Sequence, residues 1–133
     1  MNKGQRLYKF ILGLLMPFLF LACSSKERIK IDGGTFNVDG KDVQLICGEM
    51  HYARIPHEYW RDRLKRARAM GLNTISVYVF WNFHERQPGE FDFSGQADVA
   101  EFVRLAQEEG LYVILRPGPY ACAEWDFGGF SFW

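Results

Sequence analysis

Residues 74–85, TISVYVFWNFHE, decide the fold class of this chain. Thr74 to Phe80 is an apolar run rich in β-branched residues, which predicts a buried strand, and polar side chains follow it at Asn82, His84 and Glu85. Such a strand is typical of a parallel sheet that carries its chemistry at the carboxyl ends of its strands. The segments on either side fit the same arrangement.

Strands and helices alternate around this central strand. Before it, Val43 to Cys47 is predicted to be a strand and Glu58 to Met70 a helix, which a glycine follows. After it, Asp98 to Glu109 is predicted to be a second helix and Leu111 to Leu115 a third strand. Successive strands begin roughly 30 to 37 residues apart, which is the spacing expected of βαβ units in a parallel sheet.

Other local patterns complete the expected elements. Ile29 to Val38 with a turn at Asp39-Gly40 predicts an N-terminal hairpin, and Pro88-Gly89 marks a later turn. Cys47 lies in an apolar strand pattern and is expected to be buried. The helix residues expected to face the core are Trp60, Leu64, Ala67 and Met70 in the first helix, and Val99, Phe102, Val103 and Ala106 in the second.

Two architectures share this alternation, a doubly wound sheet and a (β/α)8 barrel. A doubly wound sheet needs a glycine-rich helix start after its first strand, whereas residues 48–54, GEMHYAR, do not suit phosphate binding. In a barrel the chemistry lies where the strands end. The polar residues there are Glu49 and His51, then Asn82, His84 and Glu85, and finally Arg116, Tyr120 and Glu124. The predicted fold class is α/β, the first three βα units of a (β/α)8 TIM barrel, incomplete in this chain.

The loop after the third strand is unusual in composition. Its sequence, RPGPYACAEWDFGG at residues 116–129, is stiffened by two prolines and presents Glu124 and Trp125. Glu124 is interpreted as a partner for a polyol or as a titrating group. The other polar and aromatic residues near the strand ends keep a structural alternative. In that alternative His51 and His84 would fix loops, and Glu49 would pair with Arg116. Trp81 and Trp125 would pack against the protein instead of facing a sugar.

Composition excludes several classes of function. The 133 residues include sixteen basic and sixteen acidic side chains, and no basic face for nucleic acid is predicted. A CxxC motif, a His/Cys ligand cluster and a glycine-rich phosphate loop are all absent from the sequence, so no metal or cofactor is expected.

The N-terminal segment predicts export. Residues 1–22 combine a basic head with a short apolar run, and the sequence Phe20-Leu21-Ala22-Cys23 resembles the cleavage site of a bacterial lipoprotein signal. Cys23 would be the lipidated residue and 23–30 a tether, which places the protein on a bacterial membrane, periplasmic or at the cell surface. Ordinary cleavage and an uncleaved anchor are the alternatives.

Three long motifs, in the same order, resemble glycoside hydrolase family 35, the β-galactosidases. They are residues 48–74 (GEMHYARIPHEYWRDRLKRARAMGLNT), residues 78–85 (YVFWNFHE) and residues 116–129 (RPGPYACAEWDFGG). The resemblance implies a (β/α)8 catalytic barrel followed by β-rich domains, and release of terminal β-linked galactose with retention of configuration. Two positions depart from the family pattern, Arg86 in place of proline and GGFSFW at residues 128–133.

The resemblance also implies roles for individual residues. Tyr78 resembles the family's galactose-contacting tyrosine, and Ala123 and Glu124 resemble its backbone and carboxylate contacts to the sugar hydroxyls. The residues expected to shape the mouth of the site are His51, Asn82, His84, Cys122 and Trp125.

The catalytic pair of the family is not expected within this chain. A retaining glycosidase needs two carboxylates about 5 Å apart. The family's acid/base and nucleophile glutamates lie in Asn-Glu-Tyr and Ser-Glu-Phe contexts, which are absent here, so we expect both beyond Trp133. Residues 31–133 are then the N-terminal part of an exported enzyme's catalytic domain. The alternatives are a truncated, inactive lipoprotein or pseudogene remnant, and a barrel glycosidase with another sugar specificity.

Overall fold

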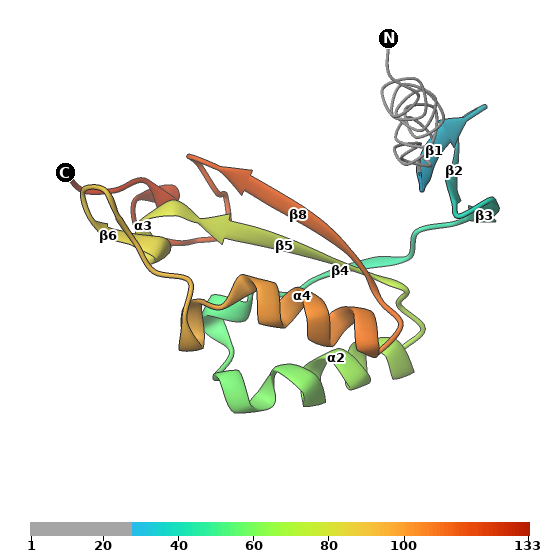
Figure 1. Ribbon diagram of the computed structural model, residues 1–133, viewed down its shortest axis with the longest axis horizontal. Helices are drawn as coiled ribbons and strands as arrows, with labels where there is room; N and C mark the ends of the chain where they lie inside the picture. The colour runs from blue at the N-terminus through green and yellow to red at the C-terminus, as the bar shows by residue number, and fades with distance from the viewer. Residues whose placement is uncertain (1–27) are drawn as a thin grey trace, which may run out of the picture. The chain divides into compact units, whose positions relative to one another are not determined.

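The computed structural model describes residues 28–133, which fall into two compact units that divide between Gln44 and Leu45 (Figure 1). The predicted signal segment 1–22, the lipidation site Cys23 and residues 24–27 of the tether lie outside the described residues. Within 28–133, no helix combines the length and the apolar character that crossing a membrane requires.

The first unit is a three-stranded antiparallel sheet of β1 (Ile29–Asp32), β2 (Thr35–Val38) and β3 (Lys41–Val43). The turn predicted at Asp39-Gly40 is confirmed, because both residues have positive φ, 51° and 84°, and connect β2 to β3. The predicted hairpin was incomplete, since Gly33-Gly34, with φ of 53° and 85°, forms a further turn between β1 and β2.

The second unit contains a parallel sheet of β4 (Cys47–Glu49), β5 (Thr74–Phe80) and β8 (Tyr112–Gly118), in that order. The predicted central and third strands are confirmed, although β8 continues past Leu115 because its pairing with β5 extends to Gly118. The predicted first strand, Val43 to Cys47, is wrong. Val43 pairs with Phe36 in the first unit, and the parallel pairing begins only at Cys47.

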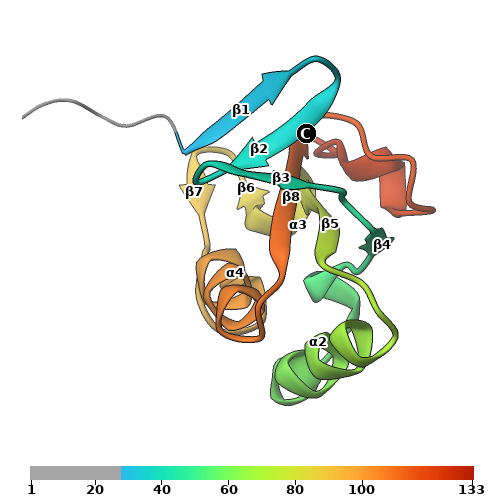
Figure 2. The same ribbon diagram turned by 90° about the vertical axis from the view of Figure 1, so that its right-hand side faces the viewer.

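Helices α2 (Trp60–Ala69) and α4 (Val99–Glu108) cover one face of this sheet (Figure 2). Each predicted helix is confirmed, with a glycine of positive φ just beyond it, Gly71 at 95° and Gly110 at 74°. Asp98 caps the start of α4, since its carboxylate accepts a hydrogen bond of 2.8 Å from the amide of Glu101. The buried residues packed between helices and sheet are Tyr52, Trp60, Leu64, Ala67, Ile75, Val77, Phe102, Leu105, Ala106 and Leu111.

Two predictions of burial are wrong. Met70 is 79% exposed because α2 ends at Ala69 and Met70 lies beyond the packed turns. Cys47 is exposed because its partner in β5 is Thr74, next to the helix-facing Ile75, so Cys47 lies on the opposite face of the sheet.

A short helix and a hairpin follow the end of β5. Helix α3 (Trp81–His84) leads into β6 (Glu85–Gln87) and β7 (Glu90–Phe91), and the turn predicted at Pro88-Gly89 joins the two strands. The described residues therefore form a mixed α/β fold with a three-stranded parallel sheet, and they do not close a barrel.

Candidate functional site

Aromatic rings from three separate segments meet at the carboxyl end of β5. The His51 ring lies 5.5 Å from the rings of both Tyr78 and Phe80, measured between centroids. The Trp125 indole stacks on Phe80 at 4.0 Å with an interplanar angle of 9°. Since Tyr78 and Phe80 are two residues apart on a strand, they project from the same face. The parallel pairing thus brings together His51, a predicted strand-end residue, with Tyr78 and Trp125, which the strand-end set did not include.

Arg116 connects this aromatic group to the end of β4. Its guanidinium lies 3.9 Å above the Tyr78 ring and donates hydrogen bonds to the Tyr78 hydroxyl and, at 2.5 Å, to the Glu49 carboxylate. The predicted ion pair is therefore present, and both side chains are about half exposed, so its stabilising effect is small. Arginine only donates, so the Tyr78 oxygen accepts this bond and keeps its own proton available for a ligand.

Asn82 and Trp125 join the loop after β8 to helix α3. The Trp125 indole N–H donates to the Asn82 amide oxygen at 2.7 Å, and the Asn82 amide nitrogen donates to the Asp126 carbonyl at 2.9 Å. Both ends of the Asn82 amide are used by the protein, so Asn82 shapes this loop through its backbone and Trp125. For Trp125, the stacked ring and the bonded N–H support the packing interpretation.

The loop itself, residues 119–130, is tightly folded. Gly128 has a φ of 62°, and a Cβ atom there would lie 2.3 Å from the Tyr120 ring, so glycine is required. The amide of Ala121 donates to the Gly128 carbonyl at 2.6 Å. Glu124 also has a positive φ, 50°, and is exposed, while Cys122 is exposed with a free thiol.

Sequence reasoning missed Arg54, which contacts this loop from the other side. Its guanidinium donates to the carbonyl oxygens of Ala123 and, at 2.9 Å, of Glu124, and lies 5.5 Å from the Trp125 ring centroid. The only signal in the sequence was one arginine in the first strand-end motif, about 70 residues from its partners. Charge pattern alone does not distinguish it from the other arginines.

His51 is the one described strand-end residue with an unsatisfied buried ring nitrogen, Nδ1. Burial is the largest cause of a lowered pKa at His51; the Glu49 carboxylate acts in the opposite direction, and the Arg54 and Arg116 cations lower the pKa further. The ordinary pKa of histidine is already below 7, so His51 is neutral at pH 7 and offers one donor and one acceptor.

His84 and Glu85 serve the hairpin instead of the open end of the sheet. The buried His84 ring lies between the Tyr52 hydroxyl, 2.5 Å from Nε2, and the Asp92 carbonyl, 2.8 Å from Nδ1. A carbonyl accepts, so Nδ1 carries the proton and Tyr52 donates to Nε2; burial raises the pKa of Tyr52 and keeps it protonated. Glu85 is buried and accepts from Trp81 and from the amide of Gly89 at 2.6 Å. Both residues therefore fix loops, the structural interpretation left open for His84.

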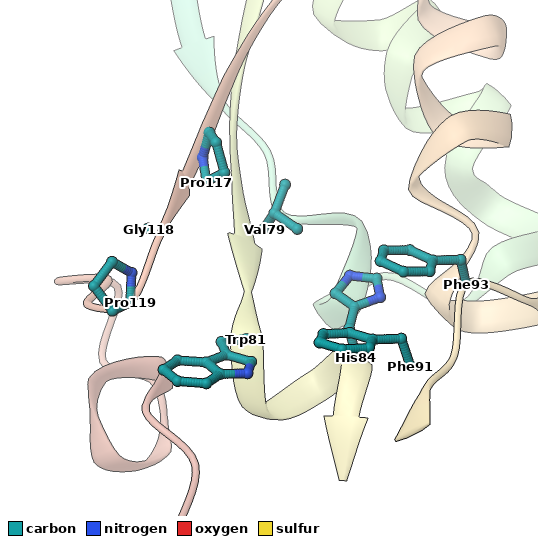
Figure 3. A pocket seen from close by; sticks show the side chains of 8 residues that line it. All are labelled: Val79, Trp81, His84, Phe91, Phe93, Pro117, Gly118 and Pro119. Atoms are coloured by element: carbon teal, nitrogen blue, oxygen red, sulfur yellow. The ribbon is translucent and has the colours of Figure 1, made fainter. Parts of the chain in front are cut away.

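An apolar pocket of about 370 Å³ lies beside this hairpin (Figure 3). Its lining residues are Val79, Trp81, His84, Phe91, Phe93, Pro117, Gly118 and Pro119. Val79 neighbours Tyr78 on β5 and so projects from the opposite face of the sheet. The pocket is separate from the group around Tyr78. In residues 28–133, no three His, Cys, Asp or Glu side chains are grouped as metal ligands would be.

The model of the family described as "Glycosyl hydrolases family 35" matches residues 35–133, which is most of this chain. The chain belongs to glycosyl hydrolase family 35. The match includes every described residue of the site, from Glu49 to Trp125.

Curated relatives of this family 35 chain carry the name β-galactosidase. The protein from Xanthomonas manihotis is 53% identical over 122 residues, which cover 92% of this chain and 20% of that protein. The Bos taurus protein is 56% identical over 127 residues, covering 90% of this chain and 19% of that protein. The family 35 chain thus spans about a fifth of the length of these relatives.

Solved glycosidase structures share the fold. An exo-β-1,4-mannosidase, Op5Man5, from Opitutaceae bacterium strain TAV5 superposes with a TM-score of 0.63 at 19% identity. The superposition covers 78% of the family 35 chain and 20% of the mannosidase. At this identity the likeness concerns the fold alone, a parallel sheet with helices packed on it.

Proposed function

We propose that the full-length protein is an exported, retaining β-galactosidase that removes terminal β-linked galactose from oligosaccharides or glycoconjugates. Residues 31–133 would be the N-terminal part of its (β/α)8 catalytic domain. One observation carries the proposal: the ends of β4 and β5 and the loop after β8 converge, so that Tyr78, Ala123 and Glu124 belong to one continuous group of contacts. Family membership and the names of the relatives agree with it.

The geometry gives each residue a separate task. Tyr78 accepts from Arg116 and would donate its hydroxyl proton to a sugar oxygen. The exposed Glu124 carboxylate would accept hydrogen bonds from sugar hydroxyls, and the Ala123 backbone would contact the same ring. Neither Glu49, which pairs with Arg116, nor Glu124 is assigned a catalytic role. In this proposal the acid/base and the nucleophile lie outside residues 31–133, elsewhere in the full-length protein.

Hydrolysis assays on the full-length protein test this function. We expect turnover of a chromogenic β-galactoside in preference to the β-mannoside and β-glucoside, with β-galactose as the first product observed by NMR. The segment from Cys23 to Trp133, assayed in parallel, should show no turnover above a buffer blank, because it lacks both catalytic carboxylates. Preference for another sugar would favour a related glycosidase. Inactivity of the full-length protein on all three would favour the inactive alternative.

The location of the protein is a second part of the proposal. We propose that Cys23 is lipidated and holds the protein at a bacterial membrane, on the basis of the signal-like segment in residues 1–22. Replacing Cys23 with Ala should abolish incorporation of labelled fatty acid, because the thiol is the attachment point. Labelling and membrane fractionation of the two proteins would check this result. Membrane retention unchanged by the substitution would contradict the lipoprotein assignment, and a Cys122→Ala variant is the matched control.

A further inference from the structure

Glu124 has a backbone conformation that its side chain does not favour. Its φ of 50° lies in the left-handed region, where the Cβ atom crowds the following carbonyl oxygen and strains the backbone. Strain of this kind persists only where surrounding contacts hold it, and it is concentrated at functional sites. The Glu124 side chain is exposed and has no hydrogen bond or ion pair to other residues in the range 28–133. The contacts that hold this conformation must therefore act on the backbone.

Arg54 makes those backbone contacts. Its Nη2 group donates to two successive carbonyls, those of Ala123 and Glu124, and its guanidinium lies over the ring of the next residue, Trp125. In a trans peptide the N–H points opposite to the C=O, so fixing the Ala123 carbonyl toward Arg54 directs the Glu124 N–H away from it. One cation thus orients three consecutive residues, including both predicted sugar contacts in this loop.

Arg54 is itself held by a rigid segment. It ends the short 3-10 helix Tyr52–Arg54, whose first residue is fully buried. The Trp60 indole donates to the carbonyls of Tyr52 and Ile55 at 3.1 and 2.8 Å, and the Gln96 side chain donates to the same two carbonyls at 2.8 and 2.7 Å. These bonds tie the backbone around Arg54 to the packed helices. Displacement of the guanidinium is therefore resisted by the core of the unit.

We propose that Arg54 is the positioning residue for Glu124, holding its left-handed backbone so that the carboxylate is presented to the sugar. The inference rests on the proposed function for the identity of the ligand. It assigns Arg54 no contact with substrate.

Kinetics of full-length Arg54→Met and Arg54→Lys variants test the role. We expect Arg54→Met to lower kcat/KM for the chromogenic β-galactoside about 10- to 100-fold, because a small misplacement of a substrate contact has an effect of this size. Arg54→Lys should recover only part of the lost kcat/KM, since an ammonium group lacks the planar set of N–H donors that a guanidinium presents. In a Glu124→Gln background, Arg54→Met should lower kcat/KM by less than about threefold, because the effects of substituting two residues that act through one another do not add. If the double variant lost kcat/KM by the product of the two single losses, the proposal would be overturned.

A second measurement does not depend on the sugar. Tyr120, Phe127 and Phe130 in the loop are exposed, so chymotrypsin cleavage there, mapped by mass spectrometry, reports the loop's order. Arg54→Met should speed this cleavage at least about tenfold. The matched control is Arg61→Met, which removes ion pairs to Glu108 and Glu109 on the helical side and should leave the loop's cleavage rate unchanged. Unchanged cleavage in Arg54→Met would refute the proposal even if the wild-type protein released no galactose, whereas that inactivity alone would refute only the proposed function.

Discussion

Glu124→Gln in the full-length protein should lower kcat/KM for a β-galactoside about tenfold to a few hundredfold, since each charge-assisted hydrogen bond contributes roughly 1.5–3 kcal/mol. The amide keeps the shape of the side chain and loses the charge. Contacts to sugar hydroxyls often strengthen in the transition state, so part of the loss should appear in kcat. Steady-state measurement of kcat and KM for Glu124→Gln and Glu124→Ala shows how the loss is divided between the two constants.

The control for this prediction is another exposed glutamate of the same chain. Glu58→Gln changes an exposed side chain on the 3-10 helix His57–Tyr59, just before α2, and should leave both constants unchanged. A nucleophile would behave differently from a binding residue, with near-total inactivation and recovery of turnover on addition of azide. Azide recovery in a Glu124 variant would show that the binding assignment is wrong, and unchanged kinetics would leave Glu124 without a role in the reaction.

Trp125→Ala should have an effect of similar size and also reduce stability. The substitution removes the ring stacked 4.0 Å from Phe80, the hydrogen bond of 2.7 Å to Asn82 and the contact with Arg54. Truncating a large aromatic side chain in a packed position costs about 3–5 kcal/mol, and less here because Trp125 is only partly buried. We expect kcat/KM to fall about 100-fold through displacement of the loop. Thermal unfolding and kinetics of the full-length variant would measure both effects.

Trp125→Phe separates the two interpretations of this residue. Phenylalanine keeps a ring on Phe80 and loses the N–H bond to Asn82, worth about 1 kcal/mol, so a packing role predicts that most of the activity returns. If Trp125→Phe were as inactive as Trp125→Ala while its unfolding temperature stayed normal, the indole would act on the sugar directly. If Trp125→Ala matched wild type in both kinetics and stability, neither interpretation would hold.

The sequence predicted the elements of the parallel sheet better than their contacts. The strand at Thr74 to Phe80 and the helix at Asp98 to Glu109 follow from local signals, apolar runs and a glycine after the helix, and the structure has both. Local signals failed where a segment was shared between two sheets. Val43 and Cys47 are close in an apolar run, yet one pairs in the antiparallel unit and the other in the parallel unit.

The site was predicted only in part for a related reason. Parallel pairing brings strand ends together whatever their residues, so the contact between Glu49 and Arg116 could be expected. The hydrogen-bond partner of each polar residue depends on the three-dimensional geometry, which leaves no periodic pattern in the sequence. His84 is buried against Tyr52 and Asp92, and Arg54 is engaged by carbonyls about 70 residues away, so neither role could be seen from composition or spacing.

The contact of Arg54 with Ala123 and Glu124 joins the first strand-end loop to the third across the strand between them. These loops are consequently not interchangeable parts. A chimera that crossed over anywhere from residue 55 to residue 122 would take the arginine from one parent and its carbonyl acceptors from the other. The geometry of the glutamate would then be inherited only if both parents shared the same loop backbone. For anyone recombining β-galactosidases of this family, residues 48–54 and 116–130 form a single unit of exchange, although they are far apart in the gene.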